Sequence, residues 1–400
     1  MMKSAYTVVL DRLLQEGRLR RLQPLAQRDG CWVCRDGRPM LNLSSNDYLG
    51  LAGNRQFLER FYAEMDADQL LDRYALGAAS SRLLCGDSEV LHQFERMLVD
   101  SYGAPAALFF NSGYHANIGL LPALFDRGDL IVSDKLNHAS LHDGLRLATA
   151  AHKRYRHLDY AHLESILARY REAYQRVVIV SESVFSMDGD VADLVELVRL
   201  KDKYDCLLYL DEAHALGVHG PRGLGKAEEM GVVDRIDLLV GPLGKACASI
   251  GAFVLCTEEI REYLINSSRS LIFTTALPPV VVSWNLYVFK QLMTMARERD
   301  HLRRLAERLR GQLRRHHLKT AGETNIVPVI VGDNRLTVQA AAELQEDGLL
   351  ILPVRPPTVP EGTARFRLSL SADMQWADLQ MVAGKIADHL QALGPIGRAR

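Results

Sequence analysis

The chain has 400 residues, with 48 Lys or Arg and 49 Asp or Glu, so its formal net charge is −1. A length of this order fits roughly two to three domains. The balanced charge gives no reason to expect nucleic acid, an anionic membrane or a polyanionic partner. No uninterrupted apolar run approaches the ~18 residues of a membrane span, and the N-terminal stretch lacks the apolar core and cleavage site of a signal peptide.

The six cysteines are scattered along the chain, which suits a reducing, cytoplasmic environment. Cys31 and Cys34 form a C-x-x-C pair. No second pair and no nearby histidines complete a zinc set. We therefore expect these two cysteines to belong to a strand with both thiols inert, and we expect no metal site.

The first hundred residues contain predicted helices separated by a hairpin. Apolar positions recur at helical spacing over 4–22, with basic residues near the end of a helix that Pro24 terminates. Residues 31–43 are typical of a small hairpin that turns at Asp36-Gly37. A second amphipathic helix is expected over 89–102.

Five short apolar runs are each followed by a polar loop. A buried parallel strand has this pattern, because both of its faces are covered. Repeated strand–loop–helix units form a mostly parallel sheet with right-handed crossovers, so the predicted fold class is α/β. The predicted strands are 106–110, 131–133, 177–180, 207–210 and 236–240.

Two of these strands lead into residues that suggest a cofactor. Asp211 and His214 follow the run at 207–210, and Lys245 follows the run at 236–240. Ligands in open α/β sheets bind just beyond the carboxyl ends of strands, so these side chains are expected to converge. A lysine for a Schiff base and an aspartate for a pyridinium nitrogen suit pyridoxal phosphate (PLP). Each residue also has an ordinary structural reading, as a solvated lysine or a turn-capping aspartate.

The same stretch resembles two motifs of nucleotide-binding ATPases. Residues 211–214 read DEAH, and residues 220–226 read GPRGLGK. A phosphate-binding loop needs Ser or Thr after its lysine to hold Mg²⁺, whereas this chain has Ala227. The glycine run also follows the acidic box instead of preceding it. We therefore exclude an ATPase.

The turn at 111–114, NSGY, is a candidate phosphate site. It lies between the predicted strand 106–110 and a predicted helix over 115–124. Free N–H groups at a helix N-terminus bind anions. Because many α/β units turn in this way, the signal is weak by itself.

The sequence pattern changes after Thr257. A long helical segment is predicted up to about His316, and the remainder mixes short strands with helices. Over 365–370 arginines alternate with apolar residues at strand period, so Arg365 and Arg367 share one face. The predicted organisation is an N-terminal arm of helix and hairpin (1–45), a large domain (46–283) and a smaller C-terminal α/β domain with a long linking helix (284–400).

Seven motifs occur in the order in which they occur in α-oxoamine synthases, and the chain resembles this family over essentially its whole length. The motifs are SSNDYLGL (44–51), NSGYHAN (111–117), NHASLHDG (137–144), ESVFSMDGD (182–190), DEAHALGVHG (211–220), GK (244–245) and IFTTALPP (272–279). The resemblance implies the aspartate-aminotransferase fold, known as PLP fold type I, with PLP as the cofactor.

The resemblance also implies catalytic roles. Lys245 would form the Schiff base and then act as the base at the substrate α-carbon. Asp211 would keep the pyridine nitrogen protonated, so that the ring can accept the electrons of a carbanion. His138 would stack on the ring, with His214 and Ser186 near the phenolic oxygen.

The cofactor phosphate has a second set of implied partners. The Ser112, Gly113 and Tyr114 turn would aim backbone amides at it, and Thr275 would reach it from the other subunit of a homodimer. The family usually has Thr or Ser three residues before the lysine, but this chain has Pro242, with neither hydroxyl nor amide proton. Losing one charge-assisted hydrogen bond would cost roughly 1.5–3 kcal/mol of cofactor binding unless it is replaced.

The substrate has implied partners as well. Arg367 would bind the carboxylate of the amino acid as a bidentate fork. Arg20, in the predicted N-terminal helix, would meet the distal carboxylate of a dicarboxylic acyl chain, although a solvated helix end explains it equally well. Asn46 and Thr358 complete the implied substrate-binding set.

Within the family, residues 355–365 most resemble the biotin-pathway branch. That branch implies a decarboxylating condensation of L-alanine with pimeloyl-CoA or pimeloyl carrier protein by a cytoplasmic, homodimeric acyltransferase. The sequence leaves the acyl carrier open. One alternative is a sister enzyme that uses glycine or serine with another acyl-CoA. Another is a non-enzymatic cofactor-binding or interaction protein on the same scaffold, for which Pro242 is the only indication.

Overall fold

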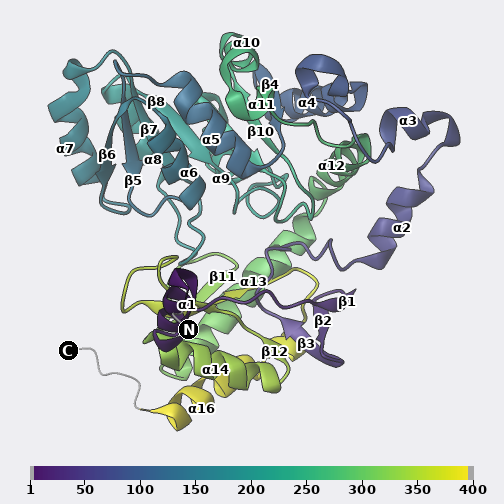
Figure 1. Ribbon diagram of the computed structural model, residues 1–400, viewed down its shortest axis with the longest axis vertical. Helices are drawn as coiled ribbons and strands as arrows, with labels where there is room; N and C mark the ends of the chain where they lie inside the picture. Colours follow the sequence, from purple (N-terminus) through teal and green to yellow (C-terminus); the bar gives the residue numbers. More distant parts are fainter. Residues whose placement is uncertain (1–3, 395–400) are drawn as a thin grey trace. The chain divides into compact units, whose positions relative to one another are not determined.

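The computed structural model describes residues 4–394 (Figure 1). Contacts within the chain divide these residues into two compact units. The larger unit comprises Gln56–Phe185 and Val191–Arg299. The smaller unit comprises the described residues within Met1–Arg55, Ser186–Asp190 and Asp300–Arg400.

A seven-stranded sheet forms the centre of the larger unit (Figure 1). Its strands are β4 (Ala106–Phe110), β5 (Leu130–Asp134), β6 (Ala151–Tyr155), β7 (Val177–Glu182), β8 (Leu207–Asp211), β9 (Leu238–Pro242) and β10 (Ala252–Cys256). They lie in the order β4-β10-β9-β8-β7-β5-β6. Only β10 is antiparallel to its neighbours, and the other four pairs are parallel. The predicted α/β class and mostly parallel sheet are confirmed.

The helices of the larger unit begin at capped N-termini. Four of them start after Ser112, Asp159, Asp193 or Thr257, each of which accepts the backbone N–H three residues further on. The helices are α2 (Arg55–Ala63), α3 (Leu70–Arg73), α4 (Glu89–Tyr102), α5 (Gly113–Leu124), α6 (Ala139–Leu147), α7 (Tyr160–Tyr170), α8 (Leu194–Lys203), α9 (Lys226–Glu229), α10 (Glu258–Ser267), α11 (Arg269–Ile272) and α12 (Pro279–Leu292).

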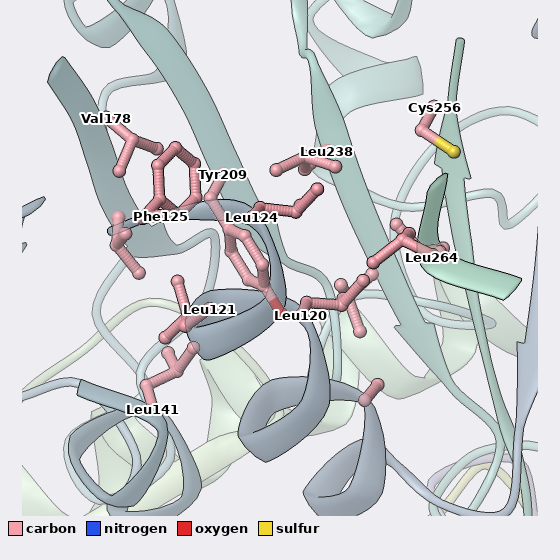
Figure 2. Close-up of a cluster of buried hydrophobic side chains, with 14 of the residues drawn as sticks. Leu120, Leu121, Leu124, Phe125, Leu141, Val178, Tyr209, Leu238, Cys256 and Leu264 are labelled. Carbon is pink, nitrogen blue, oxygen red and sulfur yellow. The ribbon is translucent and has the colours of Figure 1, made fainter. Parts of the chain in front are cut away.

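The sheet of the larger unit is covered on both faces, because every residue of β4, β5, β7, β9 and β10 is buried. On one face, Leu120 and Leu121 of α5 belong to the same buried cluster as Val178 and Tyr209 of the sheet (Figure 2). Burial of each such side chain contributes about 1.5–3 kcal/mol. This core fixes the positions of the strand ends, where polar residues begin.

The smaller unit contains segments from both the N-terminal and the C-terminal parts of the chain. Its elements are α1 (Ala5–Gln15), β1 (Ala26–Asp29), β2 (Trp32–Arg35), β3 (Arg38–Asn42), α13 (Ala296–Arg315), β11 (Ile326–Gly332), α14 (Asn334–Glu346), β12 (Leu349–Leu350), β13 (Pro353–Val354), β14 (Ala364–Ser369), α15 (Trp376–Leu379) and α16 (Val382–Leu393). One sheet has the order β1-β2-β3-β12 and the other the order β11-β14-β13. Because β12 pairs with β3, the N-terminal hairpin packs with C-terminal residues, through Val33, Met40 and Leu350.

The N-terminal helix is shorter than predicted. It ends at Gln15, whereas the apolar pattern predicts a helix over 4–22. Gly17 adopts a positive φ of 65°, and the N–H of Arg18 donates to the carbonyl of Leu13 at 2.7 Å. This left-handed turn ends the helix, so the prediction that Arg20 is helical is wrong.

The long helical segment predicted up to about His316 is two helices. Residues 293–295 separate α12 from α13. Both the N–H and the hydroxyl of Thr294 donate to the carbonyl of Gln291, at 2.9 and 2.8 Å. A threonine side chain that bonds nearby backbone competes with the helical ladder, and the chain turns there.

The predicted division at 45/46 and 283/284 differs from the two compact units. Residues up to Arg55 group with the C-terminal part, and residues up to Arg299 group with the larger unit. The predicted separate N-terminal arm does not account for the pairing of β3 with β12. Within residues 4–394, no helix has the length and apolar character needed to cross a membrane.

Candidate functional site

Chemically distinctive residues follow the carboxyl ends of five strands in the larger unit. They are Ser112 after β4, His138 after β5, Glu182 at the end of β7, Asp211 at the end of β8 and Lys245 after β9. These five strands run in one direction, so their carboxyl ends meet at one edge of the sheet. The topology therefore brings Asp211 and Lys245 to one edge, as predicted, together with His138, to which the family resemblance assigned a role.

Asp211 is buried and is bonded at both carboxylate oxygens. The backbone N–H of Ala213 donates to Oδ1, and the side-chain amide of Asn117 donates to Oδ2, each at 2.9 Å. The Asn117 amide also donates to Ser140 Oγ at 2.9 Å and accepts from the Tyr209 hydroxyl at 2.5 Å. The rotation of the Asp211 carboxylate is fixed before any ligand binds.

His138 caps the N-terminus of α6 with its own ring. The backbone N–H of Ser140 donates to His138 Nδ1 at 3.2 Å, and the Ser140 hydroxyl lies 2.8 Å from the same nitrogen. Burial lowers the pKa of His138, and the positive charge of Lys245 lowers it further, against the opposing charges of Asp211 and Asp143. His138 is therefore a neutral imidazole near neutral pH.

Glu182 is a buried acid that the sequence prediction did not assign to the site. It pairs in register with Asp211 on the neighbouring strand, and the His138 backbone N–H donates to its carboxyl. Burial raises the pKa of Glu182 well above its ordinary value, and the charge of Asp211 adds to this, while Lys245 and the His138 N–H oppose it. Glu182 therefore retains its proton where an ordinary glutamate loses it.

Lys245 lies half-buried in the turn that follows β9. Its charge acts on both His138 and Glu182, so the amine lies within electrostatic reach of the two groups. His214 is buried three residues beyond Asp211, at 3% exposure. The expected trio of Asp211, His214 and Lys245 thus belongs to adjoining loops of one unit.

The predicted phosphate turn has the geometry of a capped helix N-terminus. Ser112 is the N-cap of α5, and its hydroxyl accepts the backbone N–H of His115 at 3.2 Å. A Cβ added to Gly113 would lie 2.8 Å from Cγ of Pro242, so the ring of that proline packs directly on the turn. Glycine at 113 permits this contact, because a Cβ would clash with the proline ring. Tyr114 extends outward, and its hydroxyl donates to Asp143 at 2.8 Å.

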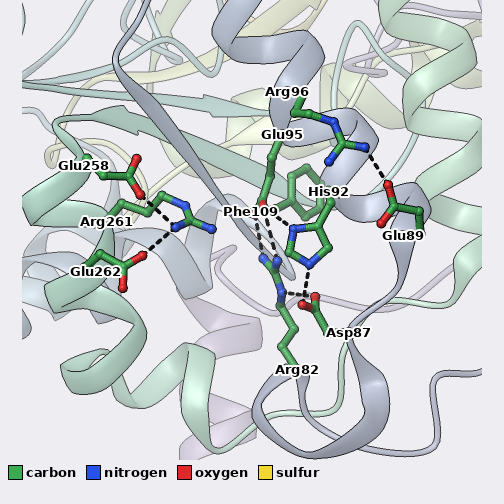
Figure 3. A network of polar contacts seen from close by, with 10 residues as sticks. All are labelled: Arg82, Asp87, Glu89, His92, Glu95, Arg96, Phe109, Glu258, Arg261 and Glu262. Atoms are coloured by element: carbon green, nitrogen blue, oxygen red, sulfur yellow. Dashed lines mark hydrogen bonds and ion pairs between the residues drawn. The ribbon is translucent and has the colours of Figure 1, made fainter.

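Thr275 is exposed, and its segment is tied to the phosphate turn of its own chain. The amide of Asn111 donates to the Thr275 carbonyl at 2.7 Å, and the N–H of Ala276 donates to the Ser80 carbonyl at 2.9 Å. Beyond Ser80 lies a polar network that fixes the loop (Figure 3). There the buried carboxylate of Glu95 accepts from Arg82 at 2.6 Å and from the Phe109 N–H of β4 at 2.9 Å.

Arg367 lies in the smaller unit, on β14, with its guanidinium held from several sides. Its Nη1 donates to Asn46 Oδ1 at 2.9 Å and to Ser369 Oγ at 2.7 Å, and its Nη2 donates to the Tyr48 hydroxyl at 2.9 Å. The backbone carbonyl of Ser186 accepts from Nε. Two predicted residues, Asn46 and Ser186, thus orient a third.

Arg20 and Thr358 also meet within the smaller unit. The Arg20 Nη2 donates to Thr358 Oγ1 at 3.0 Å. A pocket of about 620 Å³ beside them is lined by Arg20, Arg21, Arg355 and the apolar side chains of Leu19, Leu352 and Val338. Burial and the charge of Arg20 both lower the pKa of Arg355, and both arginines line this pocket.

The sequence prediction missed three residues of these constellations. Glu182 is a charged residue that closes an apolar run, which is the pattern that identified Asp211. Asn117 and Tyr48 lie inside motifs that the family resemblance covers, but no spacing rule distinguishes them. Their roles depend on which helix packs on which strand.

The residues of the larger unit fit PLP on structural grounds. A capped helix N-terminus suits the phosphate. A buried carboxylate with both oxygens bonded suits a pyridinium nitrogen, and an amine within reach suits the aldehyde. Burial raises the pKa of the Cys31 thiol to about 12, which agrees with the expected inert thiol. Cys34 lies in β2 as predicted, but Cys31 lies in the turn before that strand, so the prediction that both cysteines belong to a strand is wrong for Cys31.

The chain resembles a well-populated group of known proteins. The profile of the family described as Aminotransferase class I and II matches residues 38–386. A protein of Chlorobaculum parvum named 8-amino-7-oxononanoate synthase is 51% identical over 373 residues, which cover 93% of this chain and 95% of that protein.

Solved structures show the same fold. A structure described as SPT with PLP internal aldimine is 28% identical, with a TM-score of 0.88 over 98% of each chain. The 8-amino-7-oxononanoate synthase of Francisella tularensis is 26% identical, with a TM-score of 0.73 over 88% of this chain and 98% of that chain. The predicted fold type I and the PLP cofactor are confirmed by these matches.

Proposed function

The chain belongs to the class I and II aminotransferase family of PLP enzymes, and from this we propose that it condenses L-alanine with a pimeloyl thioester. The products are 8-amino-7-oxononanoate, CO₂ and the free thiol, and the reaction is a step of biotin synthesis. The observation that carries the proposal is 51% identity over 93% of the chain to a protein named for this activity.

In this proposal, bound PLP supplies the electron sink for a carbanion at the α-carbon of alanine. Lys245 Nζ removes the proton from that carbon. The new C–C bond forms to the thioester carbonyl as the C–S bond breaks, and the β-keto acid then loses CO₂ and is reprotonated. Asp211 would hold the proton on the pyridine nitrogen, while His138 would stack on the ring and His214 would lie near its phenolic oxygen.

We assign recognition of the two substrates to the smaller unit. Arg367 binds the carboxylate of alanine, and its bonds to Asn46 and Tyr48 reduce the side-chain entropy that binding would cost. Arg20 and Thr358 bind the distal carboxylate of the acyl chain. The support for this second role is the 3.0 Å contact between them and the arginine-lined pocket beside it.

We propose that the enzyme is a cytoplasmic homodimer in which Thr275 of one subunit reaches the phosphate bound by the other. Leu71, Leu76, Leu84 and Phe273 in the larger unit are 69–86% exposed. Large apolar side chains left in water favour a protein partner. Six free cysteines are consistent with a reducing compartment.

A substrate matrix tests the reaction. Purified PLP-loaded enzyme is mixed with alanine, glycine or serine, and with pimeloyl-CoA, pimeloyl carrier protein or palmitoyl-CoA, and products are identified by mass spectrometry. Turnover with alanine and a pimeloyl donor supports the proposal. No turnover with that pair, in preparations that bind PLP, contradicts it.

The second candidate is a sister condensing enzyme that uses glycine or serine. Its support is the close structural match to SPT, that is, serine palmitoyltransferase, over 98% of the chain. In the same matrix it predicts turnover with serine or glycine in place of alanine. A non-enzymatic protein predicts no turnover at all and a cofactor absorption band that alanine does not shift. In Lys245→Ala, the band of the covalently attached cofactor should disappear.

A further inference from the structure

Asn117 is linked by hydrogen bonds to Asp211 and, through Ser140, to His138, the two side chains that would contact the cofactor ring. It is 1% exposed, on the face of α5 that packs against the sheet. Its Nδ2 donates to Asp211 Oδ2 and to Ser140 Oγ, each at 2.9 Å, and its Oδ1 accepts from the Tyr209 hydroxyl at 2.5 Å. Both N–H groups and the carbonyl oxygen are therefore used.

The orientation of this amide follows from chemistry. An ionised carboxylate only accepts hydrogen bonds, so the nitrogen of Asn117 must face Asp211. The second N–H then points to Ser140 Oγ, which accepts it and has its own proton left to donate. That proton goes to His138 Nδ1, which lies 2.8 Å away.

His138 is thereby limited to one protonation pattern. A backbone N–H can only donate, and the N–H of Ser140 donates to Nδ1 at 3.2 Å. Nδ1 therefore has a lone pair and no proton, and the ring proton lies on Nε2. The charged groups that act on this ring are Lys245, Asp211 and Asp143.

The close approach of two helices makes the arrangement possible. Ser140 belongs to α6 and Asn117 to α5, and a Cβ on Gly144 of α6 would lie 2.4 Å from the Asn117 carbonyl oxygen. A larger residue at 144 would push α6 away from α5. The glycine thus permits the 2.9 Å bond between the amide and Ser140.

We propose that Asn117 is a positioning residue that orients the Asp211 carboxylate and directs the proton of the Ser140 hydroxyl to Nδ1 of His138, whose ring proton lies on Nε2. The carboxylate and the imidazole would then meet the cofactor ring in fixed orientations. A fully satisfied buried network of this kind costs little reorganisation when the ligand binds.

Two substitutions separate the two halves of the network. Asn117→Asp keeps the shape but places an oxygen against Asp211, so one carboxyl must take up a proton. Ser140→Ala removes only the hydroxyl between Asn117 and His138. Asn325→Asp is the matched control, because Asn325 is a buried asparagine (3% exposed) in the smaller unit.

The first measurement is ¹⁵N NMR of ring-labelled histidine in the PLP-loaded protein, with His138 assigned by His138→Gln. We expect an unprotonated Nδ1 and a protonated Nε2 over about pH 6–9 in the unmodified chain, which brackets the ordinary histidine pKa. Ser140→Ala keeps the backbone N–H that donates to Nδ1, so it should retain the tautomer with the proton on Nε2 but shift the Nδ1 resonance, because the hydroxyl donor is lost. Asn325→Asp should match the unmodified chain in both respects. A proton on Nδ1 in the unmodified chain would overturn the proposal.

The second measurement is the affinity of the apoenzyme for PLP, by absorbance titration. Asn117→Asp should weaken it by about tenfold to a hundredfold, the factor expected for one lost charge-assisted hydrogen bond, whereas Ser140→Ala should change it by less than about threefold. The proposal fails if Asn117→Asp binds PLP as the control does, or if Ser140→Ala leaves the Nδ1 resonance of His138 unchanged. If Asn117→Asp does not fold, the Ser140→Ala spectrum alone decides.

Discussion

Two carboxyl groups lie opposite each other at the ends of β7 and β8, and their surroundings differ. Asp211 receives N–H donors at both oxygens. Glu182 receives the His138 N–H, and its burial together with the charge of Asp211 raises its pKa well above the ordinary value. When their surroundings give two neighbouring acids different pKa values, the two acids usually have different roles. Here the neutral acid supports the backbone at His138 and adds no second negative charge.

A neutral Glu182 can be replaced by a neutral amide. We expect Glu182→Gln to retain kcat/KM within about threefold with the same pH profile, because its amide oxygen can still accept the His138 N–H. Glu182→Leu removes that acceptor and should lower the free energy of unfolding by about 1–3 kcal/mol, measured by urea denaturation. A loss above about a hundredfold in Glu182→Gln would mean that the anion is required.

At the scale of elements, the N-terminus of α5 has a structural and a binding role that can be separated. Ser112→Ala removes the side-chain acceptor for the His115 N–H and should cost about 1 kcal/mol of stability. Thr257→Ala removes the same kind of cap from α10, where Thr257 Oγ1 accepts the Ile260 N–H at 3.3 Å.

We expect both cap variants to lower the melting temperature similarly, but only Ser112→Ala to weaken PLP binding, because its helix presents N–H groups to the phosphate. Differential scanning calorimetry of the apoenzyme and PLP titration give the two readouts. Equal PLP affinity in the two variants would show that the phosphate does not bind at the N-terminus of α5.

Glu212 is a buried source of pH dependence in the folding of the larger unit. Glu212 is fully buried, and burial raises its pKa from 4.5 to about 7, although Ser183 Oγ and the N–H of Ala227 donate to it at 2.6 and 2.7 Å. The folded state thus binds the proton more tightly than the unfolded chain. Its stabilising contribution is complete below pH 4.5 and is lost as the pH rises through about 7.

Glu212→Gln should remove this dependence. A shift from 4.5 to about 7 corresponds to about 3 kcal/mol between the two limits. The difference in unfolding free energy between the unmodified chain and Glu212→Gln, measured by denaturant titration from pH 4.5 to 8, should therefore change by about this amount. A difference that is constant with pH would show that Glu212 titrates normally.

At the scale of the whole molecule, the proposed shared site predicts complementation between subunits. Thr275→Ala homodimers should bind PLP about tenfold to a hundredfold more weakly. In a hybrid dimer of a Thr275→Ala chain and a Lys245→Ala chain, one site combines Lys245 with the partner's intact Thr275. That site should bind PLP as the unmodified enzyme does, and the hybrid should have about half its activity. Affinity as weak as that of the Thr275→Ala homodimer would place Thr275 in its own subunit's site.

Local patterns in the sequence determined five of the seven strands of the large sheet and the residues at their ends, whereas β6 and β10 were not predicted. Apolar runs bounded by polar loops specify buried strands because alternating faces must both be covered. The parallel direction then brings Ser112, His138, Asp211 and Lys245 to one edge. These four residues could be named, and the α/β class assigned, without coordinates.

Only the tertiary structure decided how those residues are held and in what state. That β12 pairs with β3 and that α6 approaches α5 at Gly144 are long-range outcomes with no local signature. The end of α1 at Gly17 has a local signal, because glycine favours the left-handed turn that stops a helix. Burial depends on packing as well, so the neutral states of Glu182 and His138 follow from desolvation and neighbouring charges. Sequence motifs name reactive groups, and protonation is set by what surrounds them.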